Sequence, residues 1–149
     1  MARTPVRKHN VSAYRSGLEE KIAGQLEQAG LPVRFEEAYI KYVIPESDHK
    51  YTPDFILPNG IIIESKGLFD VDDRKKHLLL KDQYPELDIR FVFSRSATKL
   101  YKGAKTTYAD WCERYGFQYA DKLIPPNWLR ESHKPIPEGV LIPKGGKSK

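Results

Sequence analysis

Two carboxylates and a lysine stand at the ends of neighbouring apolar runs in the middle of the chain. Asp54 opens the first run, and Glu64 and Lys66 close the second. Carboxylate oxygens are the ligands that Mg²⁺ takes in proteins, where it keeps several of its waters. A lysine beside a metal-bound water can orient that water or stabilise charge that develops at a phosphorus atom. These residue types therefore indicate metal-dependent hydrolysis of a phosphate ester.

A β-hairpin is the local structure that would bring the three groups together. We expect strands over Tyr51–Leu57 and Ile61–Lys66, joined at Pro58-Asn59-Gly60. A two-residue turn would put the two carboxylates on opposite faces of the hairpin. Proline suits the first central position of a type I turn, and glycine suits the left-handed position that closes a three-residue loop. We therefore predict the three-residue loop.

This register has a consequence for charge. It sets Asp54 directly across from Glu64, with Cβ atoms about 4.5–5.5 Å apart. Lys66 then projects from the same face, because side chains alternate along a strand. Like charges placed opposite each other destabilise a sheet, and a bound divalent cation would offset that repulsion. The alternative is that both acids merely end strands at the solvent edge.

Glu19 is a third carboxylate, and its pattern has two interpretations. Ser16-Gly17-Leu18-Glu19 has the form of a capping box, in which Glu19 reaches back to the backbone amide of Ser16. The residues alone favour this structural role over a chemical one. A metal-binding role for Glu19 would require its side chain to give up the capping bond.

The remaining pattern predicts an α/β fold with a mixed central β-sheet flanked by helices. The run Ile61–Ile63 is apolar on both faces, as expected of a central strand that is covered on both sides. The other expected segments are a helix over about 16–29, an extended segment over 33–43, a polar connector over 45–50, a helix over about 72–83, a strand over 88–94, a helix over 107–115, and a proline-rich end anchored by Trp128.

Composition bounds the class of protein. The 149 residues fit one domain. No apolar run is long enough to span a membrane and no secretory leader is recognisable, so we expect a cytoplasmic protein. The single cysteine, Cys112, excludes an internal disulfide framework and a thiolate zinc cluster. The net charge of +5 favours an anionic partner, nucleic acid first.

The carboxylate spacing also carries a resemblance. Pro53-Asp54 followed by Glu64-Ser65-Lys66 matches the PD-(D/E)XK nuclease signature. Order and spacing over roughly residues 13–130 resemble the bacteriophage endonuclease I family, the four-way (Holliday) junction resolvases of T-odd phages. The matching segments are Arg15–Glu19, Tyr42–Pro45, Tyr51–Phe55, Leu57–Ile61, Asp72–Leu79, Pro85–Arg90 and Thr98–Gly103.

The resemblance implies a crossover junction endodeoxyribonuclease that serves phage DNA recombination, replication and host DNA breakdown in the host cell cytoplasm. The family's catalytic positions fall on Glu19, Asp54, Glu64 and Lys66. The implied metal ligands are Glu19, Asp54, Glu64 and the backbone carbonyl of Ser65. Two Mg²⁺ ions per site, which Mn²⁺ can replace, would be bridged by Asp54. The implied products carry 5′-phosphate and 3′-hydroxyl ends.

The family also implies a restriction-endonuclease-like core in a strand-exchanged homodimer. Each active site would take Glu19 from one subunit and the other three residues from its partner, with the chains crossing at the connector 45–50. The residues of that connector alone indicate an ordinary surface loop. We expect a flexible basic arm over 1–12, a nuclease domain over 13–130 and a Pro/Lys-rich C-terminal tail over 131–149.

Junction recognition by shape and charge would require phosphate contacts rather than base readout. The basic candidates are Arg3, Arg7, Lys8, Arg74, Lys75, Lys76, Lys99, Lys102 and Lys105. For each of them a solvated charged face is the alternative. His49 and His77 have no partner at ligand spacing, and we expect neither to bind metal. We also expect no membrane association and no small-molecule substrate.

The sequence is also compatible with three other functions. One is a PD-(D/E)XK nuclease of other specificity, as in transposition or mismatch nicking, which would cut a linear duplex and ignore four-way junctions. Another is a non-catalytic module that binds branched DNA without cutting it, against which the four intact catalytic positions argue. The last is a basic structural or packaging protein, which predicts no metal dependence.

Overall fold

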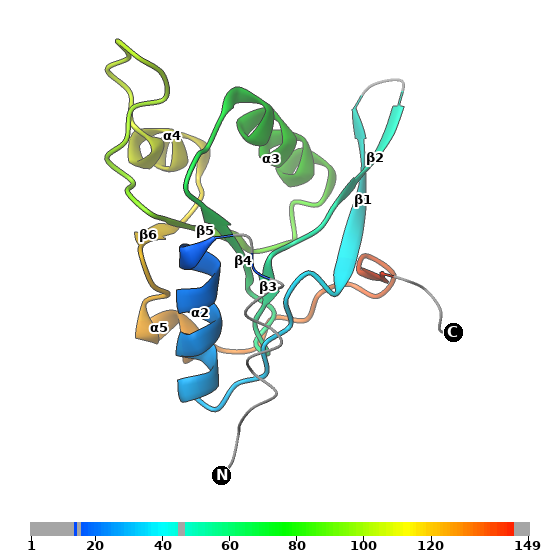
Figure 1. Cartoon of the computed structure of the whole chain (residues 1–149). Coiled ribbons are helices and arrows are strands. Elements are labelled where there is room, and N and C mark those ends of the chain that lie inside the picture. Colours follow the sequence, from blue (N-terminus) through cyan, green and yellow to red (C-terminus); the bar gives the residue numbers. More distant parts are fainter. Residues whose placement is uncertain (1–13, 15, 45–46, 145–149) are drawn as a thin grey trace.

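The computed structural model describes residues 14, 16–44 and 47–144, and its larger sheet has the strand order β3-β4-β5-β6 (Figure 1). The strands of this sheet are β3 (Phe55–Ile56), β4 (Ile62–Lys66), β5 (Ile89–Phe93) and β6 (Tyr119–Asp121). β3 runs antiparallel to β4, whereas β4, β5 and β6 are parallel. The predicted mixed sheet is therefore confirmed.

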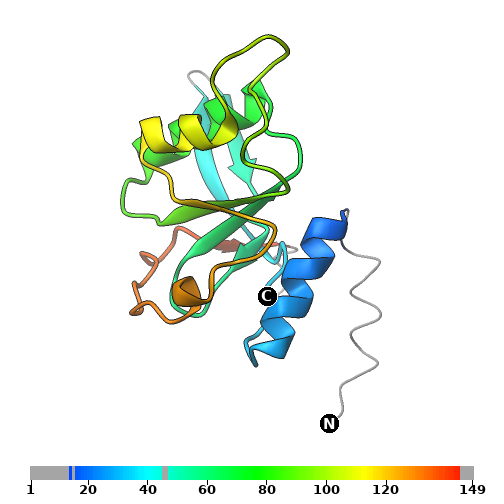
Figure 2. The same cartoon turned by 90° about the vertical axis from the view of Figure 1, so that its left-hand side faces the viewer.

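Helices cover both faces of this sheet (Figure 2). They are α2 (Gly17–Gln28), α3 (Val71–Gln83), α4 (Tyr108–Tyr115) and α5 (Pro126–Leu129). On one face Ile22 and Leu26 of α2 pack with Ile61 and Ile63. On the other face an aromatic cluster joins the sheet to α4, and it contains Phe69, Phe91, Phe93, Tyr108, Trp111, Cys112 and Phe117. The strand before Glu64 is buried on both sides, as its apolar run predicts.

Capping side chains fix where the helices begin and end. The Thr107 hydroxyl accepts from the Asp110 amide, and the Asp110 carboxylate accepts from the Thr107 amide, so α4 has a complete capping box. Gly116 ends α4 in the left-handed conformation, with φ +79°. α3 begins at Val71, one residue before the predicted start, because Asp70 and Asp73 cap it.

A second, smaller sheet has the order β2-β1-β7, and its strands are β1 (Ala38–Ile44), β2 (Ser47–Tyr51) and β7 (Ile142–Pro143). The prediction of a polar connector was therefore wrong at 47–50, which pair antiparallel with β1 as far as Ile44↔Ser47. The strand predicted over Tyr51–Leu57 was also wrong, because Tyr51 belongs to β2 and β3 begins at Phe55. Pro53 lies in this gap and has no amide hydrogen for a strand ladder.

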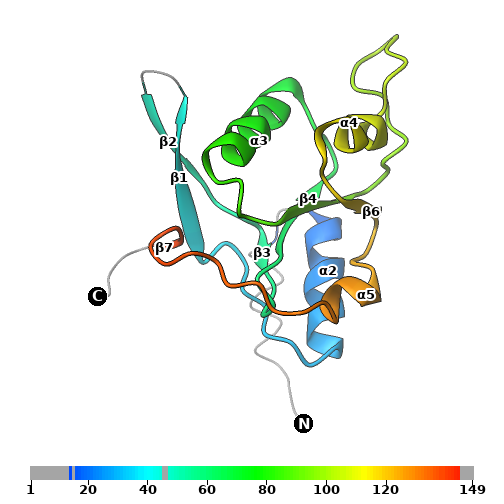
Figure 3. The same ribbon diagram turned by 180° about the vertical axis from the view of Figure 1, so that it is seen from behind.

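The segment after α5 returns along the larger sheet to β1, where β7 pairs with Ala38 and Tyr39 (Figure 3). Trp128 is buried, which confirms its predicted anchoring role. The amide of Lys134 donates to the carbonyl of Asn59 in the hairpin loop. Within the described ranges, no helix combines the length and apolar character needed to cross a bilayer.

Candidate active site

The hairpin that carries the carboxylates has the predicted loop. Phe55 pairs with Ile63, and the Leu57 amide donates to the Ile61 carbonyl at 2.8 Å. The Gly60 amide donates to the Leu57 carbonyl at 2.9 Å, and Gly60 has φ +94°. These bonds confirm a three-residue loop over 58–60, closed by a glycine in a conformation that other residues rarely adopt.

The predicted register is confirmed at Phe55↔Ile63 and Ile56↔Ile62, whereas Asp54 and Glu64 lie one step beyond the last pair of the ladder. The β3–β4 ladder ends at the pair Phe55↔Ile63. Beyond it the Asp54 carbonyl accepts from the Glu36 amide at 3.0 Å. The Asp54 carboxylate accepts from the Ser65 amide at 2.9 Å and from the Ser65 hydroxyl at 2.8 Å. Asp54 is therefore fixed by the residue after Glu64, since its chain has already left the ladder.

Glu64 and Lys66 do share one face of β4, as predicted. The Tyr51 hydroxyl donates to Oε1 of Glu64 at 2.7 Å, and Nζ of Lys66 lies 3.3 Å from Oε2 of the same carboxylate. Nζ of Lys66 also lies 3.1 Å from Oδ1 of Asp73 on α3. The lysine is thus held between a strand carboxylate and a helix carboxylate, which gives its ammonium a defined position.

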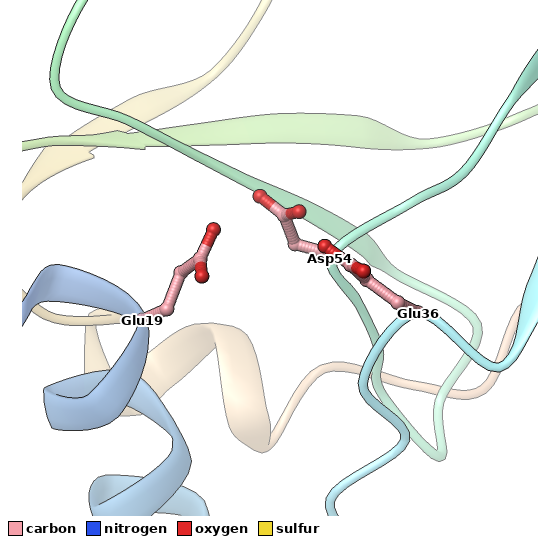
Figure 4. Close-up of side chains that lie close together, drawn as sticks. All are labelled: Glu19, Glu36 and Asp54. Atoms are coloured by element: carbon pink, nitrogen blue, oxygen red, sulfur yellow. The ribbon is translucent and has the colours of Figure 1, made fainter. Parts of the chain in front are cut away.

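Glu19 joins the site from α2. Its amide donates to the Ser16 hydroxyl at 3.1 Å, which is one half of the predicted capping box. Its carboxylate extends toward Asp54 rather than back to the start of the helix (Figure 4). Carboxylate oxygens of Glu19, Glu36 and Asp54 lie within 4.8 Å of one another. The structure contains one chain, so all three residues come from it, and the implied supply of Glu19 by a second subunit stays a prediction.

Burial disfavours the charged forms of the acidic side chains in this site. Burial raises the pKa of Asp54 to about 8, with a further upward contribution from Glu64, while the hydrogen bonds from Ser65 lower it. Burial also raises the pKa of Glu64, although Lys66 and Tyr51 pull it down. Burial opposes the charged form of Lys66, but Glu64 and Asp73 keep the pKa of this ammonium above its usual value. The lysine therefore stays charged beside carboxylates that compete for protons.

The donor set fits a hard divalent cation. It consists of carboxylate oxygens, which Mg²⁺ and Mn²⁺ accept as ligands, and contains no thiolate. Glu19 and Asp54 are buried, and Glu36 is half-buried. Three acidic side chains this close repel one another, and a bound cation would replace that repulsion with attraction.

The candidate phosphate contacts fall into separate places. Lys75, Lys99, Lys102 and Lys105 are exposed. Arg74 and Lys76 are half-buried on α3, where Arg74 donates to the Phe69 carbonyl at 2.7 Å and Lys76 lies over the Tyr51 ring. Arg3, Arg7 and Lys8 lie outside the described residues.

His77 is buried beside the site but has an apolar environment. Neither ring nitrogen has a hydrogen-bond partner among the described residues. The ring lies edge-on to Tyr51 at 5.0 Å and to Phe91 at 4.8 Å between centroids. Burial lowers the pKa of His77 well below its usual value, with a further effect of Lys76. The imidazole is therefore neutral and packs like an aromatic core side chain.

Two residues of the site, Glu36 and Tyr51, were missed at the level of sequence. Glu36 is one of two consecutive glutamates, and the bridge Phe35↔Phe55 together with the bond from its amide to the Asp54 carbonyl brings it to Asp54. Its φ of +50° is unusual for a glutamate. Tyr51 was assigned to the strand of Asp54, so its position opposite Glu64 could not be foreseen. Both residues are recognised as part of the site by a tertiary contact, and no spacing in the sequence indicates it.

Comparison with known proteins places the chain. A sequence model described as phage endonuclease I matches residues 1–148. The chain is 58% identical over 137 residues to "Endonuclease I" of Escherichia phage T7, covering 92% of each chain. It is also 58% identical over 137 residues to "Endodeoxyribonuclease 1" of Enterobacteria phage T3, covering 92% of this chain and 90% of that one. The chain belongs to the phage endonuclease I family.

Proposed function

We propose that this chain is a metal-dependent DNA endonuclease that hydrolyses phosphodiesters at four-way and other branched junctions. Family membership supports DNA cleavage in general. The observation that carries the proposal is the buried carboxylate group of Glu19, Glu36 and Asp54, which adjoins the Glu64–Lys66 pair through the hydrogen bonds from Ser65 to Asp54. In this proposal the enzyme acts in phage recombination, in replication and in the breakdown of host DNA in the host cytoplasm.

The side chains divide the work as follows. Asp54, held by Ser65, and Glu19 would hold Mg²⁺ or Mn²⁺ together with Glu64 and the Ser65 carbonyl. Two bound ions would supply an activated water and stabilise the leaving oxygen. Lys66, kept charged and positioned by Glu64 and Asp73, stabilises negative charge that develops on the phosphate. Glu36 adds negative charge to the cation side of the site.

Paired cuts on opposite strands of a junction require two active sites on one particle. We propose a strand-exchanged homodimer on a restriction-endonuclease-like core, since a two-fold axis presents two identical sites to a branch point. The partner subunit's Glu19 then occupies the position that Glu19 of the same chain has here. Basic side chains outside the active site would hold the arms through their phosphates, with little base readout.

A cleavage assay with a labelled four-way junction and a matched linear duplex tests the proposal. Reactions contain Mg²⁺ or a chelator. We expect junction cutting only with Mg²⁺, and a loss of about 10²-fold or more in Asp54→Asn, Glu19→Gln and Lys66→Ala. Glu20→Gln is the matched control, because Glu20 is the exposed neighbour of buried Glu19 and should leave the rate unchanged.

The outcomes separate the competing functions. Unchanged cutting in Asp54→Asn and Lys66→Ala would remove the site assignment. Junction binding without cutting under any metal would identify a binding module instead. Cutting of the linear duplex with no preference for the junction would indicate a nuclease of other specificity. Asp54→Ala should keep or improve junction binding in chelator above about pH 8, where the Asp54 carboxyl is ionised and repels phosphate when no cation lies between them.

A further inference from the structure

The loop that follows β5 starts next to Lys66, the candidate catalytic lysine. The Ser94 amide donates to the Lys66 carbonyl at 3.0 Å. β4 and β5 are parallel, so their carboxyl ends lie at one edge of the sheet. The chain leaves β5 at this edge, and Ser96 bonds to Asp121 at the end of β6 before the loop continues to α4. Residues 94–107 therefore rise from the edge that holds Glu64 and Lys66.

This loop has an ordered conformation although it projects from the body of the molecule beyond α4 (Figure 1). Main-chain bonds close it, from Leu100 to Thr106 at 2.9 Å and from Tyr108 to Thr98 at 2.8 Å, where the first residue of each pair donates. Ala104 is buried and its amide donates to the Tyr101 carbonyl at 3.0 Å. The tip is thus held in place by its own hydrogen bonds.

The chemistry of the tip is aromatic and cationic. The Tyr101 side chain is 67% exposed. Lys99, Lys102 and Lys105 around it are exposed as well. No acidic residue occurs anywhere from Ser94 to Ala109. An exposed aromatic ring among lysines is the arrangement on which unpaired bases stack while the cations hold the phosphates.

We propose that the loop 94–107 is a stacking platform for a base that a branch point leaves without a stacking neighbour, with Tyr101 as the ring that receives it. This inference rests on the proposed nuclease function, because the loop starts at the sheet edge where Lys66 lies. A linear duplex keeps its bases stacked inside the helix and offers Tyr101 nothing but the backbone. The loop therefore adds to the preference for branched over linear DNA that the placement of phosphate contacts provides.

Binding measurements in chelator, with 2-aminopurine placed at the branch of a four-way junction, test the platform. We expect Tyr101→Ala to weaken junction binding about tenfold and linear-duplex binding hardly at all, and to abolish the change in 2-aminopurine fluorescence on binding. Tyr101→Phe keeps the ring and should behave like the wild type. Lys102→Ala should weaken binding to both DNAs and reduce the salt slope by about 1.

Two results would overturn the platform. One is a Tyr101→Ala variant that binds the junction as tightly as the wild type, and the other is an equal loss on junction and linear duplex. Equal thermal midpoints of the variants exclude misfolding as the cause. If the wild type cuts no branched DNA but Tyr101 still governs the fluorescence, the nuclease proposal fails and the platform stands. If the wild type cuts junctions and Tyr101→Ala matches it in every assay, the platform proposal fails and the nuclease proposal stands.

Discussion

The protonation state of Asp54 has a large effect on the net charge of the site. Asp54 is buried, it accepts two hydrogen bonds from Ser65, and its remaining titratable neighbours include the carboxylates of Glu19, Glu36 and Glu64. With a pKa of about 8, this carboxyl holds a proton at neutral pH when no cation is bound. A metal ion and a proton therefore compete for the same oxygens.

Stability in chelator should depend on pH through this group. In the unfolded chain an aspartate loses its proton near pH 4, whereas folded Asp54 keeps its proton to about pH 8. The folded state binds the extra proton in between, so the contribution of Asp54 to stability falls as pH rises from about 4 to 8. Urea unfolding across this range should show a steeper decline in the wild type than in Asp54→Asn.

Added Mg²⁺ should flatten that decline, because the cation takes over the role of the proton. Parallel pH curves for the wild type and Asp54→Asn in chelator would contradict this account of Asp54.

The residue scale also shows what a sequence can predict about a site. Asp54, Glu64 and Lys66 were recognisable because spacing along one hairpin brings them near each other. The hydrogen bonds that hold Asp54 were not predictable, since they come from the Glu36 amide and from Ser65. Tyr51 reaches the site at the end of β2 and Glu36 from a bend before β1, and nothing in their local sequence distinguishes them from surface residues.

At the scale of elements, the hairpin loop depends on a glycine for two reasons. Gly60 has φ +94°, and a Cβ there would lie 1.9 Å from the Lys134 carbonyl oxygen. Gly60→Ala should therefore destabilise the protein by at least about 2 kcal/mol. Gly24 in α2 has open space around its Cβ position, so Gly24→Ala should stabilise by up to about 1 kcal/mol. Chemical denaturation of both variants checks the opposite signs, and equal effects would refute the close approach.

Elements whose ends are capped by side chains were predicted almost to the residue. α4 is the clearest case, because Thr107, Asp110 and Gly116 specify both of its ends locally. The extended segment predicted over 33–43 contains most of β1, whereas β2 was missed for the opposite reason. Four of the five residues of β2 are polar and mostly exposed, so they carry no alternating apolar pattern. Their strand conformation comes from pairing with β1, a contact that composition does not reveal.

At the scale of the whole molecule, one buried arginine ties β5 to the returning C-terminal segment. Arg90 is 1% exposed and makes paired hydrogen bonds with Asp88 and with Glu131, while its guanidinium lies over the Trp128 ring. Both carboxyls have lowered pKa values because Arg90 binds their charged forms, although burial opposes this at Asp88. The network closes the face of the sheet opposite α3.

Arg90→Ala should cost about 3 kcal/mol of unfolding free energy, since it leaves Asp88 and Glu131 with only the exposed Lys134 as a shared cation and removes packing against Trp128. Arg34→Ala is the matched control. Arg34 pairs with Glu37 at the surface, and its loss should cost less than about 1 kcal/mol. Urea unfolding measures both, and similar losses in the two variants would show that the Arg90 network contributes no more than a surface pair.

Hydrogen exchange in the β1–β2 ribbon reports on the buried carboxylate of Glu64, because Tyr51 of β2 donates to it. Beyond Tyr39, β1 has β2 as its only described partner strand, so amides of this ribbon exchange with solvent through local opening. Tyr51 ends the ribbon, and any opening that includes it breaks the bond to Glu64. Deuterium uptake over 47–51 is therefore linked to whatever occupies the site, and it should slow when the site is filled.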